Sequence, residues 1–209
     1  RHWAVGSARR PTTTEATVHV TINGNTQFLI ADEIGDIVPG SEQGFYHSDI
    51  RFLSEYLLEL NGRRLRPLAT RVLEHFHSVH LLSNPVGDEL ETESLTLLRQ
   101  RLLDGVLHED LELQSYLDRP VLLQLQFTFA ADFLHIFQVR GHMGPQEPAA
   151  AARGTLVRPL PDGRGIYLSK SDGREFPCVE IRFSQPPSYP RPNVVRFVVT
   201  LPPRGTWRL

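Results

Sequence analysis

Three side chains that can bind ions or transfer protons lie close together in GFYHSDIRFL, at positions 44–53. They are His47, Asp49 and Arg51. On an extended chain alternate side chains point the same way, so Asp49 and Arg51 could form a bidentate carboxylate–guanidinium contact, or each could satisfy backbone groups. Between a reactive site and an electrostatic brace where a strand begins, we favour the brace, because it needs no partner from elsewhere in the chain.

A second group, EHFHSVH at positions 74–80, contains three histidines. On a regular strand His75 and His77 share one face and could chelate a metal ion, whereas His80 would lie on the other face. A metal site ordinarily needs a third ligand and a supporting shell of hydrogen bonds, and the sequence points to neither. We therefore expect no metal and no other cofactor, with His75 and His77 as weak metal candidates.

Carboxylates suited to glycoside hydrolysis are plentiful, since that reaction needs two of them across a cleft. Any soluble domain has as many, so we favour solvated faces and turn caps over catalysis. The sequence has no Gly-x-Ser-x-Gly nucleophile turn and no phosphate-binding glycine loop, and we expect no catalytic residue. The acids considered are Asp32, Glu33, Asp36, Asp49, Glu109, Asp110 and Asp132.

Aromatic rings that face water beside polar groups can stack on sugars. We take Tyr46 and Tyr116 as the sugar-contact candidates, from a set that also includes Trp3. Trp207 follows LPPRGT and is expected to close the core at the last strand.

The overall composition argues against two classes of binding partner, nucleic acids and membranes. The 209 residues carry a formal net charge of −2 and no long basic run, so neither nucleic acid nor an anionic membrane has electrostatic support. No apolar run approaches the ~20 residues that cross a bilayer. The single cysteine, Cys178, fits a reducing compartment, and we expect a cytoplasmic protein. The chain starts at Arg1 instead of Met, which indicates a fragment of a longer polypeptide.

The dominant period of the apolar residues is two, which is typical of strands with one buried face. In VLLQLQFTF, the residues Leu123, Leu125, Phe127 and Phe129 alternate with polar ones. The same alternation predicts strands in TVHVTI at 17–22, FLHIFQV at 133–139 and VVRFVVTL at 194–201, and a further strand is expected over 52–60. No segment shows a long helical stripe.

Five Asn-Gly or Asp-Gly dipeptides mark tight turns, at 23–24, 61–62, 104–105, 162–163 and 172–173, because these residues tolerate positive φ. Segments 141–154 and 184–192 are rich in Pro, with Gly and Ala in the first, and are expected to be loops. The prediction is an all-β fold, a large antiparallel β-sandwich with few or no helices. One domain is expected over 27–209, after an N-terminal segment and first strand at 1–26.

An ordered series of motifs resembles the N-terminal domain of bacterial glycogen debranching enzymes of the amylo-α-1,6-glucosidase type. The resemblance covers about residues 27–141. The motifs are Gly35-Asp36, Gly44-Phe45, Asp49-Ile50-Arg51-Phe52-Leu53, Leu58-Glu59-Leu60-Asn61-Gly62, RQRLLDGVLHEDLELQSY at 99–116 and FAADFLHIFQVRG at 129–141.

This resemblance implies a supersandwich-like β domain placed before a catalytic α/α toroid, with the acid and the base in the toroid. No catalytic residue carries over to this chain. The motif residues carry over as structural or domain-interface positions, namely Asp36, His47, Asp49, Arg51, Asn61, Gly62, Asp132 and Arg140.

The favoured function is therefore an accessory domain of an α-glucan debranching hydrolase, without activity of its own. It would dock on the catalytic domain of the same polypeptide and assist glucan binding. The alternatives are a freestanding carbohydrate-binding module and, less favoured, a metal-dependent β-barrel enzyme that uses His75 and His77. A homo-oligomer is compatible with the sequence.

Overall fold

The computed structural model describes residues 19–85, 90–142, 155–170 and 177–209. Within these ranges the chain forms four antiparallel sheets, and the one helix, α1 (Ile136–Val139), has four residues. The all-β, antiparallel prediction is therefore confirmed. Over the described ranges the structure offers no helical segment with the length and apolar character of a membrane span.

Sheet A is a meander in the order β1–β2–β3–β4. Its strands are β1 (Val20–Gly24), β2 (Gln27–Ala31), β3 (Gly44–His47) and β4 (Ile50–Leu53). The connection from β2 to β3 covers residues 32–43 and runs into the centre of the molecule, so the position of sheet A decides where the acids of that loop lie.

Sheet B has the order β15–β16–β11–β5–β6. Its strands are β5 (Glu55–Leu60), β6 (Arg63–Arg64), β11 (Val121–Ala130), β15 (Ser188–Arg191) and β16 (Val194–Leu201). In β11 the burial alternates as the sequence predicts, with Leu123, Leu125, Phe127 and Phe129 inside.

Sheet C has the order β17–β10–β9–β8–β7. Its strands are β7 (Arg66–Glu74), β8 (His77–Ser83), β9 (Leu95–Leu103), β10 (Leu107–Ser115) and β17 (Thr206–Arg208). Strands β8, β9 and β10 are paired along almost their whole length, which makes this the most regular part of the fold.

Sheet D is the small antiparallel sheet β12–β13–β14. Its strands are β12 (Thr155–Pro159), β13 (Gly165–Lys170) and β14 (Cys178–Arg182). Ile166 and Leu168 of β13 are fully buried, and they join sheet D to the common core.

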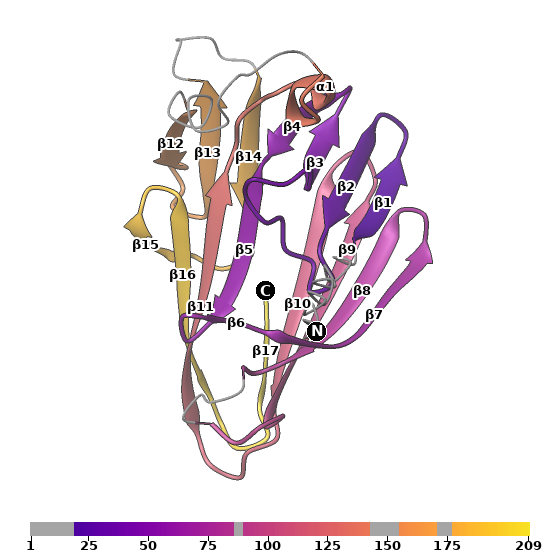
Figure 1. Cartoon of the computed structure of the whole chain (residues 1–209). Coiled ribbons are helices and arrows are strands. Elements are labelled where there is room, and N and C mark those ends of the chain that lie inside the picture. The colour runs from indigo at the N-terminus through magenta and orange to yellow at the C-terminus, as the bar shows by residue number, and fades with distance from the viewer. Residues whose placement is uncertain (1–18, 86–89, 143–154, 171–176) are drawn as a thin grey trace, which may run out of the picture.

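Sheets B and C form two long layers, and sheets A and D lie toward the upper end of the molecule in Figure 1. Leucines and phenylalanines from the inner faces of both long sheets form one buried cluster. Full burial of such a side chain stabilises the fold by about 1.5–3 kcal/mol. Trp207 of β17 packs on this cluster, with its ring centroid 5.7 Å from that of Phe197, as the sequence predicts.

Two predicted element boundaries are wrong in the first part of the chain. Asn23 and Gly24 end β1, and the turn follows at residues 25–26, where Asn25 has a φ of 52°. The strand expected over 52–60 is broken at Ser54, because β4 and β5 belong to different sheets. The turns predicted at 61–62, 104–105 and 162–163 are confirmed, each with a glycine at positive φ.

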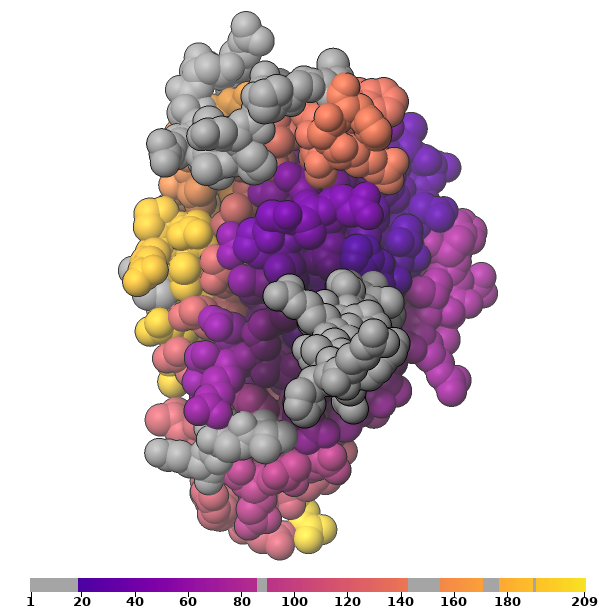
Figure 2. Space-filling view, viewed as in Figure 1, coloured from indigo at the N-terminus to yellow at the C-terminus, as the bar shows by residue number. Residues whose placement is uncertain are grey.

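The strand expected over 133–139 is replaced by α1. Phe133 has a φ of 52°, which ends the extended chain, and His135 caps the helix by accepting a hydrogen bond from the backbone N–H of Phe137. Figure 2 shows this segment on the surface at the same end as β3 and β4. The expected loop 184–192 contains β15, whereas the turn predicted at 172–173, Trp3 and residues 143–154 lie outside the described residues.

Candidate functional site

The loop after β2 folds around Asp32 and carries Asp36 into the centre of the molecule. Asp32 Oδ1 accepts hydrogen bonds from the backbone N–H groups of Ile34 (3.0 Å) and Asp36 (2.8 Å), a local turn that aspartate side chains favour. Gly35 has a φ of +82°, and a Cβ on it would lie 3.2 Å from the imidazole of His80. The turn therefore requires glycine at this position, both for its backbone angle and for space.

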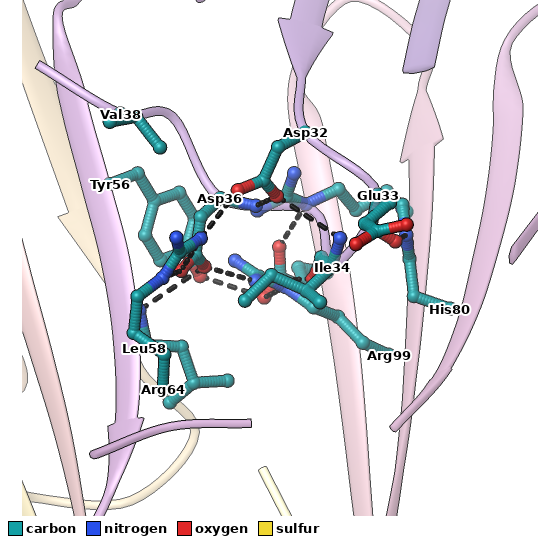
Figure 3. A network of polar contacts seen from close by, with 12 residues as sticks. Asp32, Glu33, Ile34, Asp36, Val38, Tyr56, Leu58, Arg64, His80 and Arg99 are labelled. Atoms are coloured by element: carbon teal, nitrogen blue, oxygen red, sulfur yellow. Dashed lines mark hydrogen bonds and ion pairs between the residues drawn. The ribbon is translucent and has the colours of Figure 1, made fainter. Parts of the chain in front are cut away.

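Asp36 is fully buried, and donors surround its carboxylate. Oδ1 accepts from the backbone N–H of Leu58 (3.2 Å) and from Arg99 Nη1 (2.8 Å), and Oδ2 accepts from Arg64 Nε (3.1 Å) and Nη2 (2.9 Å). Arg64 also binds Asp32, and its side chain is 44% exposed. Its partly exposed side chain therefore forms the solvent side of the group. Figure 3 shows Arg64 and Arg99 beside Asp36.

Glu109 of β10 binds the two arginines that point inward from β9. Arg99 Nε donates to Oε1 at 2.9 Å, and Arg101 Nε donates to Oε2. Tyr56, from β5 in the opposite sheet, donates its hydroxyl to Oε1 at 2.8 Å. The guanidinium carbons of Arg99 and Arg101 lie 4.8 and 4.9 Å from the centroid of the Tyr56 ring, so cation–π attraction adds to the ion pairs.

Burial and the neighbouring charges determine whether Glu109 and His80 carry a proton near neutral pH. Burial by itself would raise the pKa of Glu109, but the charges of Arg101 and Arg99, with hydrogen bonds from Arg101 and Tyr56, outweigh burial and lower the pKa to about 2. Burial, followed by the charge of Arg101, lowers the pKa of His80 to about 4. Near neutral pH the group therefore contains an ionised Glu109 and an uncharged His80.

Three carboxylates face three guanidiniums in this ion network, and burial raises the pKa of Asp36. Each carboxylate is bound by at least one guanidinium, and none of them is a free general acid or general base. The arrangement can hold sheets B and C in register with the loop that follows β2, which is a structural role. The carboxylates belong to Asp32, Asp36 and Glu109 and the guanidiniums to Arg64, Arg99 and Arg101.

Arg51 forms a second buried ion pair, with Asp132 from the segment after β11. Its Nε lies 3.2 and 3.1 Å from the two carboxylate oxygens, Nη2 also binds Oδ2, and the two side chains are 5% and 3% exposed. Nη1 donates to the carbonyls of Ser41 (2.8 Å) and Gln43 (3.2 Å). A Cβ on Gly44 would lie 2.5 Å from Cδ of Arg51, so glycine leaves room for the arginine stem.

The Asp49–Arg51 contact considered from the sequence is not formed. Asp49 and Ser48 are the two turn residues of the β3–β4 hairpin, with φ values of 64° and 46°. The chain is therefore not extended at Asp49, and the shared strand face assumed from the spacing does not exist. The Asp49 carbonyl accepts from the backbone N–H of Ile136 at 2.8 Å. His47 is exposed, so this predicted cluster separates into a turn and a buried ion pair.

Other motif positions lie in turns and at the surface. Asn61 and Gly62 form the β5–β6 turn with φ values of 51° and 75°, and Asn61 Oδ1 accepts from the backbone N–H of Gln124 at 3.0 Å. Arg140 follows α1, is 46% exposed and lies 3.4 Å from Glu42. These contacts give the three residues structural roles in turns and at the end of α1.

The two tyrosines proposed as sugar contacts differ in exposure. Tyr46 is 1% exposed, its ring stacks on Phe28 at 4.5 Å, and its hydroxyl donates to the Glu42 carbonyl. This burial corrects the expectation that Tyr46 faces water. Tyr116 is 56% exposed and its hydroxyl lies 3.2 Å from the hydroxyl of Thr96, so its ring stays available.

The histidines proposed as metal candidates do not share a strand. His75 lies in the turn after β7, whereas His77 begins β8, so the expected common face is absent. Across the described ranges, no three His, Cys, Asp or Glu side chains are grouped as a metal ion would require. His80 is buried on the inner face, with Nδ1 2.9 Å from the carbonyl oxygen of Glu33.

A cavity of about 410 Å³ opens beside the ion network, between β3, β4, β11, β14 and the start of β10. Its polar lining includes Glu109 and Tyr56 of the network together with Gln27 and His47. Gln27 Nε2 donates to the carbonyl of Gly105 at 2.9 Å and lies 3.1 Å from His47 Nδ1. The apolar lining includes Phe45, Phe52, Phe127, Phe129, Val179, Ile181 and Phe183.

Arg99 and Arg101 were quoted from the sequence as part of a motif but given no role, although LTLLRQRLL contained a signal. Its inward positions are Leu95, Leu97, Arg99, Arg101 and Leu103, and an inward charge requires a buried partner. The expectation of solvated faces and turn caps fails for four of the acids in that they are largely buried, because carboxylates bound to arginine can be buried. These four are Asp32, Asp36, Glu109 and Asp132. Asp32 and Asp132 also cap local turns, as expected. Nothing in the sequence around Gln27 or Arg64 indicated that they belong to the site.

Comparison with protein families gives a match over most of the chain. A model described as the N-terminal domain of (some) glycogen debranching enzymes matches residues 22–209. That range contains the ion network, the Arg51–Asp132 ion pair and the whole lining of the cavity. The comparison with curated proteins found no match.

Proposed function

The chain belongs to the family of N-terminal domains of glycogen debranching enzymes, and from this membership we propose that it is the non-catalytic N-terminal domain of an α-glucan debranching hydrolase. It packs against a separate glucosidase domain of the same polypeptide, an α/α toroid, and helps that domain to hold its substrate. The proposal includes a location in the bacterial cytoplasm.

The outer face of sheet C is the observation that carries the packing proposal. The two arginines of β9 point inward, whereas Leu98 and Leu102 of the same strand point outward and are partly exposed. Val79 and Leu81 of β8 also point outward, and the register places Leu81 opposite Leu98. Val79, Leu81 and Leu98 therefore form a small apolar patch, bordered by Gln100, on the outside of the sheet. Apolar surface of this kind is typical of a face that another protein covers.

The outer face of sheet B differs in chemistry, apart from its exposed Leu122 and Val198. Gln126 Nε2 donates to Glu59 at 3.0 Å, and Arg196 Nη2 donates to Gln126 at 2.9 Å. This polar row crosses three neighbouring strands and suits a face in contact with water. The contrast favours sheet C as the docking side.

The buried acids support a non-catalytic role. Inverting and retaining glycosidases need one carboxyl group that gives up a proton near neutral pH. Glu109 is the buried acid nearest the cavity, and its pKa of about 2 keeps it ionised. Asp36 and Asp132 are each bound to arginine away from that lining.

The packing proposal is tested in the full-length enzyme with the double substitution Leu81→Glu and Leu98→Glu. We expect the domain to separate, seen as a larger radius of gyration in small-angle X-ray scattering. The matched control, Gln124→Glu with Thr200→Glu on the outer face of sheet B, should leave the scattering unchanged. Identical scattering for both double variants would refute docking through sheet C.

The non-catalytic role is tested with the 209-residue chain alone. It should release no glucose from limit dextrin, whereas the full-length enzyme should do so. Release by the chain that persists through rigorous removal of contaminating hydrolases would end this proposal.

The cavity favours a freestanding carbohydrate-binding module as a second candidate function. A module of that kind binds α-glucan equally well alone and within a longer protein. An accessory domain instead shares the glucan with its neighbour, so the full-length enzyme should bind it more tightly than the chain alone.

A further inference from the structure

We propose that the cavity between β3, β4, β11 and β14 is a binding site for a glucosyl residue of an α-glucan. The preference for α-glucan rests on the proposed function. The preference for a sugar ring rests on the lining, which combines aromatic walls, hydrogen-bonding groups and balanced charge.

The size of the cavity suits a small ligand. Its volume of about 410 Å³ falls within the range of roughly 300–1,000 Å³ for protein ligand sites. It is bounded by strands of all four sheets and by the β9–β10 turn. Walls built on paired strands keep their shape, so the site exists before a ligand arrives.

Aromatic side chains form the apolar walls. Phe45, Phe52 and Phe183 are partly exposed and line the cavity, and Phe127 and Phe129 lie behind them with stacked rings 6.2 Å apart. A pyranose ring has one or two faces of C–H bonds, which pack on aromatic rings as other apolar surfaces do. These walls therefore accept the faces of a sugar.

Gln27 supplies an unused acceptor at the cavity. It is 8% exposed, and its amide nitrogen is engaged by Gly105 and His47. Its Oε1 is buried and has no hydrogen-bond partner within the described ranges. A buried acceptor without a partner costs free energy, which a ligand hydroxyl group can recover after a small side-chain movement.

The charges of the lining select a neutral ligand. Glu109 is offset by Arg99 and Arg101, and Glu180 is paired with Arg182. An anion would meet no free cation in the lining that the structure describes. A cation would meet Glu109 and Glu180 already paired with arginine, and Asp110, which is exposed and lies 3.2 Å from His108. Hydroxyl groups fit such a site, because each can donate and accept hydrogen bonds.

The test uses the 209-residue chain, maltoheptaose as the probe and cellohexaose as the control for linkage. Titration calorimetry should show binding of maltoheptaose at least about tenfold tighter than binding of cellohexaose, a difference of 1.4 kcal/mol. Methyl NMR spectra should show maltoheptaose shifting the signals of Val179, Ile181 and Leu107, which line the cavity. The methyl signals of Leu122, on the outer face of sheet B, should not move.

Two substitutions locate the binding. Val179→Trp fills the cavity and should abolish binding, and His47→Ala, at an exposed position, should weaken it about fivefold through the loss of one hydrogen bond. The matched control, Gln124→Ala on the outer face of sheet B, should bind as the unchanged chain does. The NMR shifts need no substitution, so they decide the matter even if Val179→Trp fails to fold.

The outcomes separate this inference from the proposed function. Unmoved cavity signals at saturating maltoheptaose, or equal binding of cellohexaose, overturn the glucosyl site. Preferential binding of dodecanoate in the cavity also overturns it and identifies an apolar-chain site. None of these results alters the docking test on sheet C, which stands on different residues.

Discussion

Asp132 has Arg51 as its cationic partner, and both side chains are hidden from water. We expect Asp132→Ala to lower the free energy of unfolding by about 3–5 kcal/mol, because it leaves a buried guanidinium without its counter-charge. Urea denaturation monitored by circular dichroism measures the change. The exposed pair Asp118–Arg204 provides the control, and Asp118→Ala should have no measurable effect.

A second variant separates charge from packing at this site. Replacing both partners, as Arg51→Met with Asp132→Leu, should recover most of the lost stability, since no unpaired charge remains. A double variant as unstable as Asp132→Ala would show that the stability lost in Asp132→Ala comes from altered packing and not from an unpaired charge.

His80 and Glu109 make stability depend on pH. The unfolded chain protonates His80 near pH 6.5 but the folded chain only near 4, so the free energy of unfolding should fall as the pH drops from 6.5 to 4. Glu109 adds a second fall between about 4.5 and 2, where the unfolded chain alone takes up the proton. Each amounts to a few kcal/mol.

Urea titrations at several pH values measure this dependence. His80→Gln should remove the fall in stability between pH 6.5 and 4. Glu109→Gln should remove the fall between about pH 4.5 and 2. A curve that stays flat between pH 6.5 and 4 in the unchanged chain would contradict the assignment of His80.

At the scale of the element, strand β9 gives a matched pair of neighbouring leucines. Leu97 is 0% exposed, whereas Leu98 points outward. In the 209-residue chain, Leu97→Ala should cost about 2–5 kcal/mol of stability through the cavity that it leaves. Leu98→Ala should change stability by less than about 1 kcal/mol, as at other surface positions. Equal losses in denaturant titrations would contradict the inward and outward assignment.

The β3–β4 hairpin gives a prediction about backbone conformation. Asp49 has a φ of 64°, which a β-branched residue adopts only with strain. Asp49→Val should therefore destabilise the chain by about 1–2 kcal/mol, whereas Asp49→Gly should be neutral within about 1 kcal/mol. Thermal unfolding compares the two, with Thr21→Val on β1 as a control in extended backbone. Similar losses for Asp49→Val and Asp49→Gly would assign the effect to the side chain.

Elements with a strict alternation could be predicted from the sequence. Strand β11 and the Asn61-Gly62 turn follow from period-two burial and from positive φ. The segment 133–139 shows the same alternation but forms α1, because the left-handed Phe133 and the cap by His135 outweigh it. The alternation of apolar residues carries no information on backbone dihedrals or helix caps. The helix at 136–139 could therefore not be predicted from it.

At the scale of the whole molecule, the ion network joins loop 32–36, sheet B and sheet C. Together with the shared core, it predicts that residues 27–209 unfold as one domain. Far-UV circular dichroism and tryptophan fluorescence should therefore give one coincident thermal transition. Two separated transitions would divide the chain into two domains.

Long-range partners were the part that the sequence did not supply. Arg51 and Asp132 are 81 residues apart, and Arg99 and Asp36 are 63 apart. The resemblance named four of the residues as motif members without pairing them. Their pairing depends on the order of strands within the sheets, and a period of two leaves that order open.

The balanced ion network also limits how this protein can diverge over generations. Losing a buried member of the network, such as Arg99 or Glu109, leaves an unpaired charge inside the fold, at a cost of about 3–5 kcal/mol. A domain with a total stability of about 5–15 kcal/mol tolerates few such steps. Descendants should therefore inherit these residues as a set, or exchange them together for apolar ones.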